Sequence, residues 1–306
     1  EGLTPAERQD TYGEIRNYLP NLYADMRPVG LPSDDSQMAF WTLEELIAAG
    51  GLVPASLAKR FSEEKIFGIG QTVSQFVTAY KYLQEPWYRA GQPSAGNGAL
   101  MRIAPILIPH LRNPSPALWA DAVLAGMITH NDRASNAACV GFIHLLWETL
   151  RLSSAPPPVW WLETFSQAAV PLEGEINYVP RNAGISYRGP VSKFAEVEAG
   201  KAIEEGLSSL EACETWHSGA YLLETLPCVL YILAKHGQDP EEAIVRAVND
   251  TKDNDTVAAI VGAAVGALHG RSRLPERWIE GLLGRTGEDD DGKMFEIIAK
   301  AKETFL

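Results

Sequence analysis

The chain has 306 residues, of which 46% are hydrophobic and 21% are charged, and its formal net charge is −13 at pH 7. This composition is that of an ordinary globular protein with a sizeable core, and the acidic balance argues against a nucleic-acid phosphate backbone as the main partner, since that binding needs clustered Lys and Arg. No apolar run approaches the roughly 20 residues that span a bilayer, and the first residues lack the basic and apolar segments of a secretory signal.

Almost every periodic stretch has the helical period, and none alternates strictly over six or more residues, which predicts an all-α protein. Ser115-Pro116 and Asp239-Pro240 are typical helix starts, and Gly237 and Gly270 stand where C-terminal caps belong. The Pro156-Pro157-Pro158 run is the best linker candidate, but apolar helices continue on both sides, so we expect a single compact multi-helix domain over residues 1–306. The predicted helices are 37–49, 117–128, 131–151, 159–169, 193–215, 221–235, 243–248, 257–268, 276–283 and 293–304.

Two short acidic clusters each immediately precede a strongly apolar stretch. They are residues 33–36 (Ser-Asp-Asp-Ser) and 253–256 (Asp-Asn-Asp-Thr). Asp and Ser stand at such positions most often because they cap helices. Their oxygens are also the ligands of hard cations such as Mg²⁺, and two facing clusters can hold a pair of ions. Because residues 257–268 are apolar all round, we expect that helix to be buried, and acids at a buried helix terminus favour a metal site.

Two further segments lie between these clusters. Residues 94–102 (Ser-Ala-Gly-Asn-Gly-Ala-Leu-Met-Arg) form a Gly-rich turn whose backbone N–H groups can cradle phosphate oxygens, although a plain loop has the same composition. At 129–132 (Thr-His-Asn-Asp) one helix ends and the next begins, so Asn131 or Asp132 is explained as an N-cap. His130 is then either a satisfied histidine at the junction or a ligand contact.

Three other features carry expectations of their own. Residues 171–190 are rich in Gly, Pro, Asn and Tyr without a helical period, which is typical of a binding loop or lid and equally of a passive connector. The acidic run 288–291 is interpreted as a solvated loop with helix-capping acids. The three cysteines lie far apart in apolar helical stretches, so we expect reduced core thiols in a cytoplasmic protein. They are Cys139, Cys213 and Cys228.

In their order along the chain, these segments resemble the ADP-ribosylglycohydrolase family, which includes the dinitrogenase reductase-activating glycohydrolases. The resemblance runs from about Leu31 to Gly270. Each motif is weak alone, whereas the six in order are specific. The matching segments are residues 32–39 (Pro-Ser-Asp-Asp-Ser-Gln-Met-Ala), 68–72 (Gly-Ile-Gly-Gln-Thr), 96–102 (Gly-Asn-Gly-Ala-Leu-Met-Arg), 129–132, 218–226 (Ser-Gly-Ala-Tyr-Leu-Leu-Glu-Thr-Leu) and 253–256.

The resemblance implies an all-helical fold with a dinuclear metal cleft and a hydrolase that removes ADP-ribose from a mono-ADP-ribosylated target, arginine being the favoured linkage. It implies two Mg²⁺ or Mn²⁺ ions, and Asp35 or Asp255 as the acceptor of the attacking water's proton. The implied metal ligands are Ser33, Asp34, Asp35, Asp253, Asp255 and Thr256. The implied ADP-ribose contacts are Ser94, Gly96, Asn97, Gly98 and Met101 along the diphosphate, His130 near the ribose and Tyr221 against the adenine.

Three departures from the family pattern stand beside the resemblance. No Gly-Asp pair precedes Ser33, Thr251-Lys252 replaces the usual Gly-Gly, and Gly68 stands where some members place an Asp. The first two favour an alternative, a catalytically silent member that binds ADP-ribose or a protein partner. A metal-dependent phosphohydrolase is a third hypothesis. We expect a monomer whose substrate is an ADP-ribosylated protein or an ADP-ribose derivative.

Overall fold

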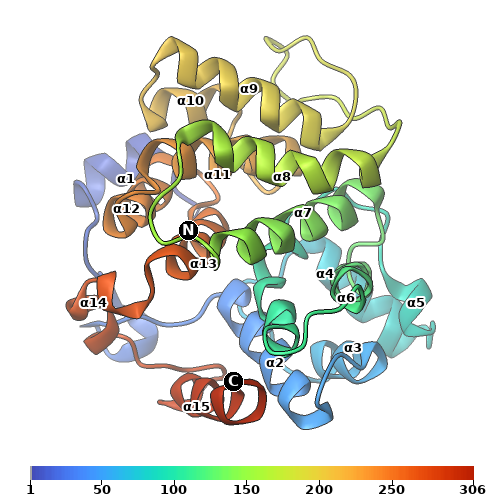
Figure 1. Cartoon of the computed structure of the whole chain (residues 1–306). Coiled ribbons are helices and arrows are strands. Elements are labelled where there is room, and N and C mark those ends of the chain that lie inside the picture. Colours follow the sequence, from blue (N-terminus) through green and yellow to red (C-terminus); the bar gives the residue numbers. More distant parts are fainter. Residues whose placement is uncertain (1) are drawn as a thin grey trace. The chain divides into compact units, whose positions relative to one another are not determined.

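The computed structural model describes residues 2–306, and nearly all of its regular structure is helical (Figure 1). The predicted all-α class is confirmed. Strand in the described residues is limited to β1 (Pro20–Asn21) and β2 (Arg27–Pro28), which pair antiparallel with Pro20 opposite Pro28. No helix between residues 2 and 306 has both the length and the apolar character needed to cross a membrane.

The chain forms two compact units, and neither is continuous in sequence. Unit 1 comprises the chain up to Val29 and residues 144–281, and unit 2 comprises residues 30–143 and 282–306. One boundary lies inside helix α7 (Arg133–Thr149). The proline run at 156–158 therefore does not divide the chain into successive domains, and the single domain over 1–306 stays a prediction.

Unit 1 is built around α11, which packs against α8, α9, α10, α12 and α13 (Figure 1). Every residue from Leu222 to Ala234 is buried, as expected for a helix with apolar residues on all faces. The helices of unit 1 are α1 (Pro5–Tyr12), η1 (Leu22–Ala24), α8 (Pro158–Glu173), α9 (Val191–Glu205), α10 (Ser209–Thr215), α11 (Leu222–His236), α12 (Pro240–Asp250), α13 (Asn254–His269), η5 (Arg271–Arg273) and α14 (Glu276–Glu280).

Several predicted boundaries in unit 1 are wrong, among them the end of 276–283, since α14 closes at Glu280, and the start of 243–248, since α12 begins at Pro240. The sequence predicts one helix over 193–215, but the chain breaks at Gly206, whose φ of +68° ends α9. Ser208 and Glu211 then form a capping box that starts α10. Helix α8 also continues to Glu173 with Pro171 inside it, so the irregular segment begins only at Gly174.

Unit 2 packs α2 against α3, α15, η3 and η4. Its core includes Met38 and Trp41 of α2 together with Phe61, Phe76 and Met101. The helices of unit 2 are α2 (Asp34–Ala49), α3 (Pro54–Glu63), α4 (Gln71–Val77), the π-helical turn η2 (Thr78–Tyr82), α5 (Trp87–Ala90), η3 (Leu100–Arg102), η4 (Ala104–His110), α6 (Ala117–Met127) and α15 (Lys293–Phe305).

Two of the smaller expectations hold. All three cysteines are free and buried, as expected of core thiols. Within the acidic run, Glu288, Asp289 and Asp291 are exposed. Asp290 accepts hydrogen bonds from the backbone N–H groups of Thr286 and Gly287, at 3.0 and 2.8 Å, and from the Thr286 hydroxyl. The run is therefore a solvated turn closed by one carboxylate.

Candidate metal centre and nucleotide site

The first acidic cluster stands at the start of α2 in unit 2. Ser33 is the N-cap residue, but its hydroxyl makes no capping hydrogen bond and instead donates to Asp35 Oδ2 at 2.6 Å. Asp35 is 1% exposed, while Ser33 and Asp34 are half-buried. Carboxylates in the first turn are stabilised by the positive end of the helix dipole. The cluster therefore gathers a hydroxyl and two carboxylates at one helix terminus.

The N-cap residues of the two acidic clusters make no capping hydrogen bond. In other helices of the chain the N-cap side chain does accept hydrogen bonds from the first turn, as with Thr4, Ser208 and Asp239. At α2 and α13 the N-cap residues, Ser33 and Asp253, make no such bond. Ser33 and Asp253 therefore do not cap their helices through a side-chain hydrogen bond, whereas Asp34, Asp35 and Asp255 stand in the first turn, where the helix dipole stabilises a carboxylate.

The second cluster begins α13 in unit 1. Thr256 is 5% exposed, and Asp253 and Asp255 are half-buried. No residue from 257 to 268 is exposed, although only one face of the helix, including Ile260 and Val261, is fully buried. The expectation of a wholly buried helix is thus met on one face, and the acids stand at a partly buried terminus.

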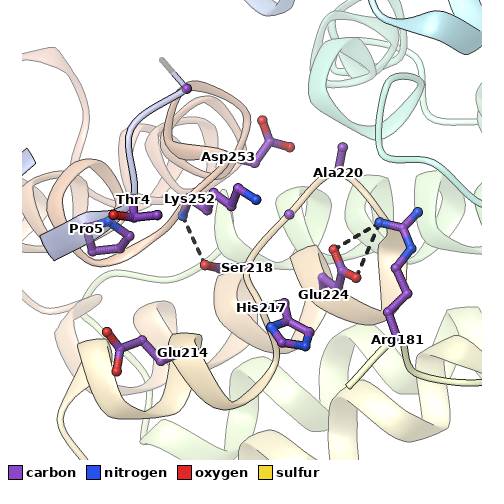
Figure 2. Close-up of a pocket in the computed structure, with 12 residues that line it drawn as sticks. Thr4, Pro5, Arg181, Glu214, His217, Ser218, Ala220, Glu224, Lys252 and Asp253 are labelled. Carbon is purple, nitrogen blue, oxygen red and sulfur yellow. Dashed lines mark hydrogen bonds and ion pairs between the residues drawn. The ribbon is translucent and has the colours of Figure 1, made fainter. Parts of the chain in front are cut away.

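Ser218 holds the chain that enters the second cluster (Figure 2). Its carbonyl oxygen accepts from the Asp253 N–H at 2.9 Å, and its hydroxyl accepts from the Lys252 N–H at 3.0 Å. Both Ser218 (φ 41°) and the preceding His217 (φ 69°) adopt positive φ. Non-glycine residues rarely do so, and such positions concentrate at functional sites.

A cavity of about 640 Å³ opens beside Asp253 within unit 1 (Figure 2). Glu224 lines it at 4% exposure, and burial raises the pKa of its carboxyl group despite the nearby Arg181. Arg181 Nη1 lies 3.4 Å from Glu224 Oε1, and the guanidinium group lies 4.8 Å from the centroid of the Tyr221 ring. Tyr178 meets the same ring edge-on at 6.3 Å. The segment 174–190 therefore contributes to the cavity wall and to the surroundings of Tyr221, which favours a binding loop over a passive connector.

The Gly-rich turn lies in unit 2 against His130. A Cβ atom added at Gly98 would lie 2.9 Å from His130 Cε1, and one added at Gly96 would lie 3.2 Å from His130 Nε2. A side chain at Gly98 would thus force the imidazole to move, and one at Gly96 would crowd it. Ser94 supports the turn, since its hydroxyl accepts from the Gly96 N–H at 3.3 Å and lies 3.0 Å from Thr72 Oγ1.

His130 is 2% exposed, and its Nδ1 lies 2.9 Å from Thr129 Oγ1. Burial, with a smaller effect from the charge of Arg102, lowers the pKa of His130 to about 3. The ring is therefore neutral at physiological pH. Asp132 accepts from the Ala134 N–H at 2.8 Å, so its role is the predicted N-cap of α7.

Within each unit the structure gathers several of the site residues. Unit 2 gathers residues 33–35 at α2 and, separately, the 94–98 turn at His130. In unit 1, Ser218 holds residues 252–253 by hydrogen bonds, and Tyr221 follows it in the same loop. Asn97 is buried at 5% exposure, and Met101, at 8%, belongs to the core of unit 2.

Sequence reasoning assigned no role to Arg102, Thr129 or Glu224. Arg102 and Thr129 stand inside the quoted motifs, and Glu224 follows Tyr221 in the 218–226 motif. A charged residue within an apolar stretch is the sequence pattern that could have indicated Arg102 and Glu224. Both are almost completely buried, which is rare for charged side chains.

Residues 1–303 match the protein family described as ADP-ribosylglycohydrolase. The chain is 26% identical to an ADP-ribosylarginine hydrolase of Serratia proteamaculans, over 82% of this chain and 63% of that protein. It is 23% identical to the ADP-ribosyl-[dinitrogen reductase] glycohydrolase of Rhodospirillum rubrum, over 92% of this chain and 83% of that protein. A solved structure titled ADP-ribosylglycohydrolase-related protein complex superposes with a TM-score of 0.66 at 27% identity, covering 96% of this chain and 88% of that one.

Proposed function

This chain belongs to the ADP-ribosylglycohydrolase family, and we propose from this premise that it removes ADP-ribose from arginine side chains of modified proteins with the help of two divalent cations. Its relatives are named as enzymes that remove ADP-ribose from modified proteins. The arginine linkage is taken from the name of the Serratia proteamaculans relative and proposed for this chain, and the two cations are our own addition. The observation that supports the cations most strongly is that α2 and α13 each begin with several oxygen-bearing side chains, and that the N-cap residues Ser33 and Asp253 make no capping hydrogen bond.

The donor set fits hard divalent cations. All six proposed ligands offer carboxylate or hydroxyl oxygens, which Mg²⁺ and Mn²⁺ prefer. Three come from the start of α2 and three from the start of α13, and no thiol or imidazole is among them. We propose that both groups together hold the two ions. The ligands are Ser33, Asp34, Asp35, Asp253, Asp255 and Thr256.

We propose that ADP-ribose lies with its diphosphate along the Gly-rich turn. Ser94, Gly96, Asn97, Gly98 and Met101 would line this group. His130, which approaches Gly96 and Gly98, would contact the ribose. Tyr221 would stack on the adenine, and because Arg181 now lies over that ring, the base would use the other face or displace the guanidinium.

The proposed reaction is hydrolysis at the anomeric carbon of the ribose attached to the target. The bond from that carbon to the guanidinium nitrogen breaks through an oxocarbenium-like state, water supplies the new oxygen, and the leaving nitrogen takes a proton. Asp35 or Asp255 would accept the water's proton at a carboxylate oxygen. When bound, the cations supply charge that orients the ribose hydroxyls and lowers the pKa of water.

The test is release of free ADP-ribose from an arginine-ADP-ribosylated protein, with Mg²⁺ and with EDTA. We compare the parent with the double variant Asp34→Ala/Asp255→Ala. The control, Asp10→Ala/Asp289→Ala, removes the same charge from exposed positions. We expect release from the parent and the control only with Mg²⁺, and none from the first variant. Metal-independent release, or an active Asp34→Ala/Asp255→Ala variant, would contradict the proposal.

The catalytically silent alternative is favoured by the missing Gly-Asp pair and by Lys252, whose backbone N–H is bonded to Ser218 next to the proposed ligand Asp253. An ammonium group near the ligands opposes cation binding through like charge. If the parent binds ADP-ribose but releases none from any linkage, and Lys252→Gly restores turnover, this alternative replaces the proposed hydrolysis.

A further inference from the structure

The imidazole of His130 has two different environments on its two nitrogens. Nδ1 lies 2.9 Å from Thr129 Oγ1. Nε2 is directed toward the Gly-rich turn, because a Cβ at Gly96 or Gly98 would lie 3.2 or 3.3 Å from it. The described residues give Nδ1 a hydrogen-bond partner and Nε2 none.

Arg102 decides the direction of the hydrogen bond between Thr129 and His130. Its Nη2 donates to Thr129 Oγ1 at 2.8 Å and to the Ala125 carbonyl at 3.1 Å. A guanidinium group has no acceptor, so the threonine oxygen must accept this bond. Among residues 2–306, the Thr129 hydroxyl has hydrogen-bond partners only in Arg102 and His130. Its single hydrogen is therefore satisfied only if it points to His130 Nδ1, and a buried hydroxyl left without an acceptor costs about 1–3 kcal/mol.

Arg102 remains a cation although it is fully buried. Burial lowers the pKa of its guanidinium to about 10, which still leaves it charged at neutral pH. Its Nε and Nη1 atoms have no hydrogen-bond partner, and the group lies 4.6 Å from the centroid of the Phe61 ring. Burying a charge is costly. The role that explains a buried arginine here is to hold its two hydrogen-bond partners in position.

Backbone hydrogen bonds connect the residues on both sides of His130 to Gln92, which precedes the Gly-rich turn. The Gln92 N–H donates to the Thr129 carbonyl at 3.0 Å, and the Asn131 N–H donates to the Gln92 carbonyl at 2.8 Å. These bonds hold the backbone on both sides of His130 against Gln92, two residues before the turn begins. The Nε2 atom therefore faces the Gly-rich turn.

We propose that Arg102 and Thr129 are positioning residues that fix His130 as the tautomer with hydrogen on Nε2, so that it donates to a ribose or phosphate oxygen of ADP-ribose. This inference rests on the proposed function for the identity of the ligand. The inference goes beyond the proposed function because it assigns the His130 imidazole as a hydrogen-bond donor to an oxygen atom of the ligand. The imidazole of His130 is neutral, which fits this assignment. A neutral imidazole donates only from the nitrogen that carries the hydrogen, so donation from Nε2 depends on the tautomer.

Two pairs of variants test the tautomer. The amide NH₂ of glutamine replaces an Nε2–H donor, whereas asparagine is shorter and reaches only the Nδ1 position. We expect His130→Gln to bind free ADP-ribose within a fewfold of the parent, and His130→Asn to bind about tenfold more weakly or worse. Thr129→Val should also weaken binding by about tenfold, with Thr129→Ser as its matched control.

NMR of the imidazole nitrogens tests the tautomer of His130 independently of ligand binding. In protein with ¹⁵N-labelled histidine, the signals absent from His130→Gln identify His130. We expect an unprotonated Nδ1 and a protonated Nε2 in the parent and Thr129→Ser, and protonation at Nδ1 in a detectable population of Thr129→Val. Thermal unfolding monitors the fold of each variant.

Hydrogen on Nδ1 of the parent, or tighter binding by His130→Asn than by His130→Gln, would overturn the inference. A failure of the proposed function remains distinguishable. Absence of ADP-ribose release from every modified protein would refute hydrolysis, while the nitrogen signals and the binding of free ADP-ribose still decide the tautomer.

Discussion

Arg8 and Thr251 are 243 positions apart, yet Arg8 Nη1 donates a hydrogen bond to the Thr251 carbonyl oxygen at 3.0 Å. The same nitrogen reaches the carbonyls of Val248 and Asn249 at the C-terminus of α12. Arg8 is 3% exposed, and burial lowers its pKa, although the charges of Asp250 and Asp255 oppose this effect. A cation at a helix C-terminus satisfies carbonyls that lack partners within the helix. The N-terminal helix α1 thereby fixes the segment that leads to Asp253.

Arg8→Met should lower the free energy of unfolding by about 2–3 kcal/mol, because several buried carbonyl oxygens lose a charged donor. Urea unfolding measures this. Arg151→Met is the matched control, since Arg151 is exposed and its ion pair with Glu148 contributes little. An equal and small loss in both variants would show that Arg8 is not a structural cap.

Ser33→Ala should weaken divalent-cation binding more than it lowers maximal turnover. The hydroxyl donates to Asp35 Oδ2 at 2.6 Å, so its removal frees the carboxylate to rotate. Loss of a group that orients a ligand costs about 10–100-fold in metal affinity. Activity measured against Mn²⁺ concentration should shift to higher metal while approaching the parent's plateau. An unchanged metal dependence would exclude Ser33 from the centre.

The pH dependence of stability should report His130. Its pKa is about 3 in the folded protein and 6.5 as the ordinary value. Between these values the unfolded chain binds a proton that the folded chain does not, so this residue makes the free energy of unfolding fall as the pH falls from 6.5 toward 3. The slope is at most about 1.4 kcal/mol per pH unit. His130→Gln should lose this contribution, and parallel pH profiles of parent and variant would contradict the assignment.

Gly98→Ala should weaken the binding of free ADP-ribose, because its Cβ would lie 2.9 Å from His130 Cε1 and push the imidazole away from the turn. Calorimetric titration with ADP-ribose measures the effect, which we expect to be about tenfold or more. In Gly51→Ala the added carbon meets nothing within 4 Å, and binding should be unchanged. Equal affinities for both variants would show that His130 does not contact the ligand.

Glu173→Ala should destabilise unit 1 by about 2–3 kcal/mol. The Glu173 side chain is fully buried at the end of α8 and accepts from the N–H groups of Val191 and Ser192, the latter at 2.8 Å. It thus caps α9 and ties together the two ends of the 174–190 segment. Glu173→Gln retains one acceptor oxygen and should recover part of the loss. Urea unfolding that leaves all three proteins equally stable would refute this role.

The sequence predicted the features that depend on local patterns. Helical periodicity and the absence of alternation indicate the all-α class, and a cap at Asn131 or Asp132 is predicted because capping depends only on neighbouring residues; the structure assigns it to Asp132. The break between α9 and α10 was missed although Gly206 and the Ser208 capping box were both present, because the surrounding apolar period continued through them. Short helices such as α4 and α5 were missed because few residues carry a period.

By itself, the sequence determined the helical class, the two acidic clusters and the Gly-rich turn, since each is written in consecutive residues. Only the tertiary structure decided what those residues contact. It showed that the side chains of Ser33 and Asp253 make no capping hydrogen bond, and it revealed Arg8, Arg102 and Thr129 as partners. The physical reason is that a buried hydrogen bond is selected by three-dimensional proximity and by the cost of an unsatisfied polar group, and neither is encoded in the spacing of residues along the chain.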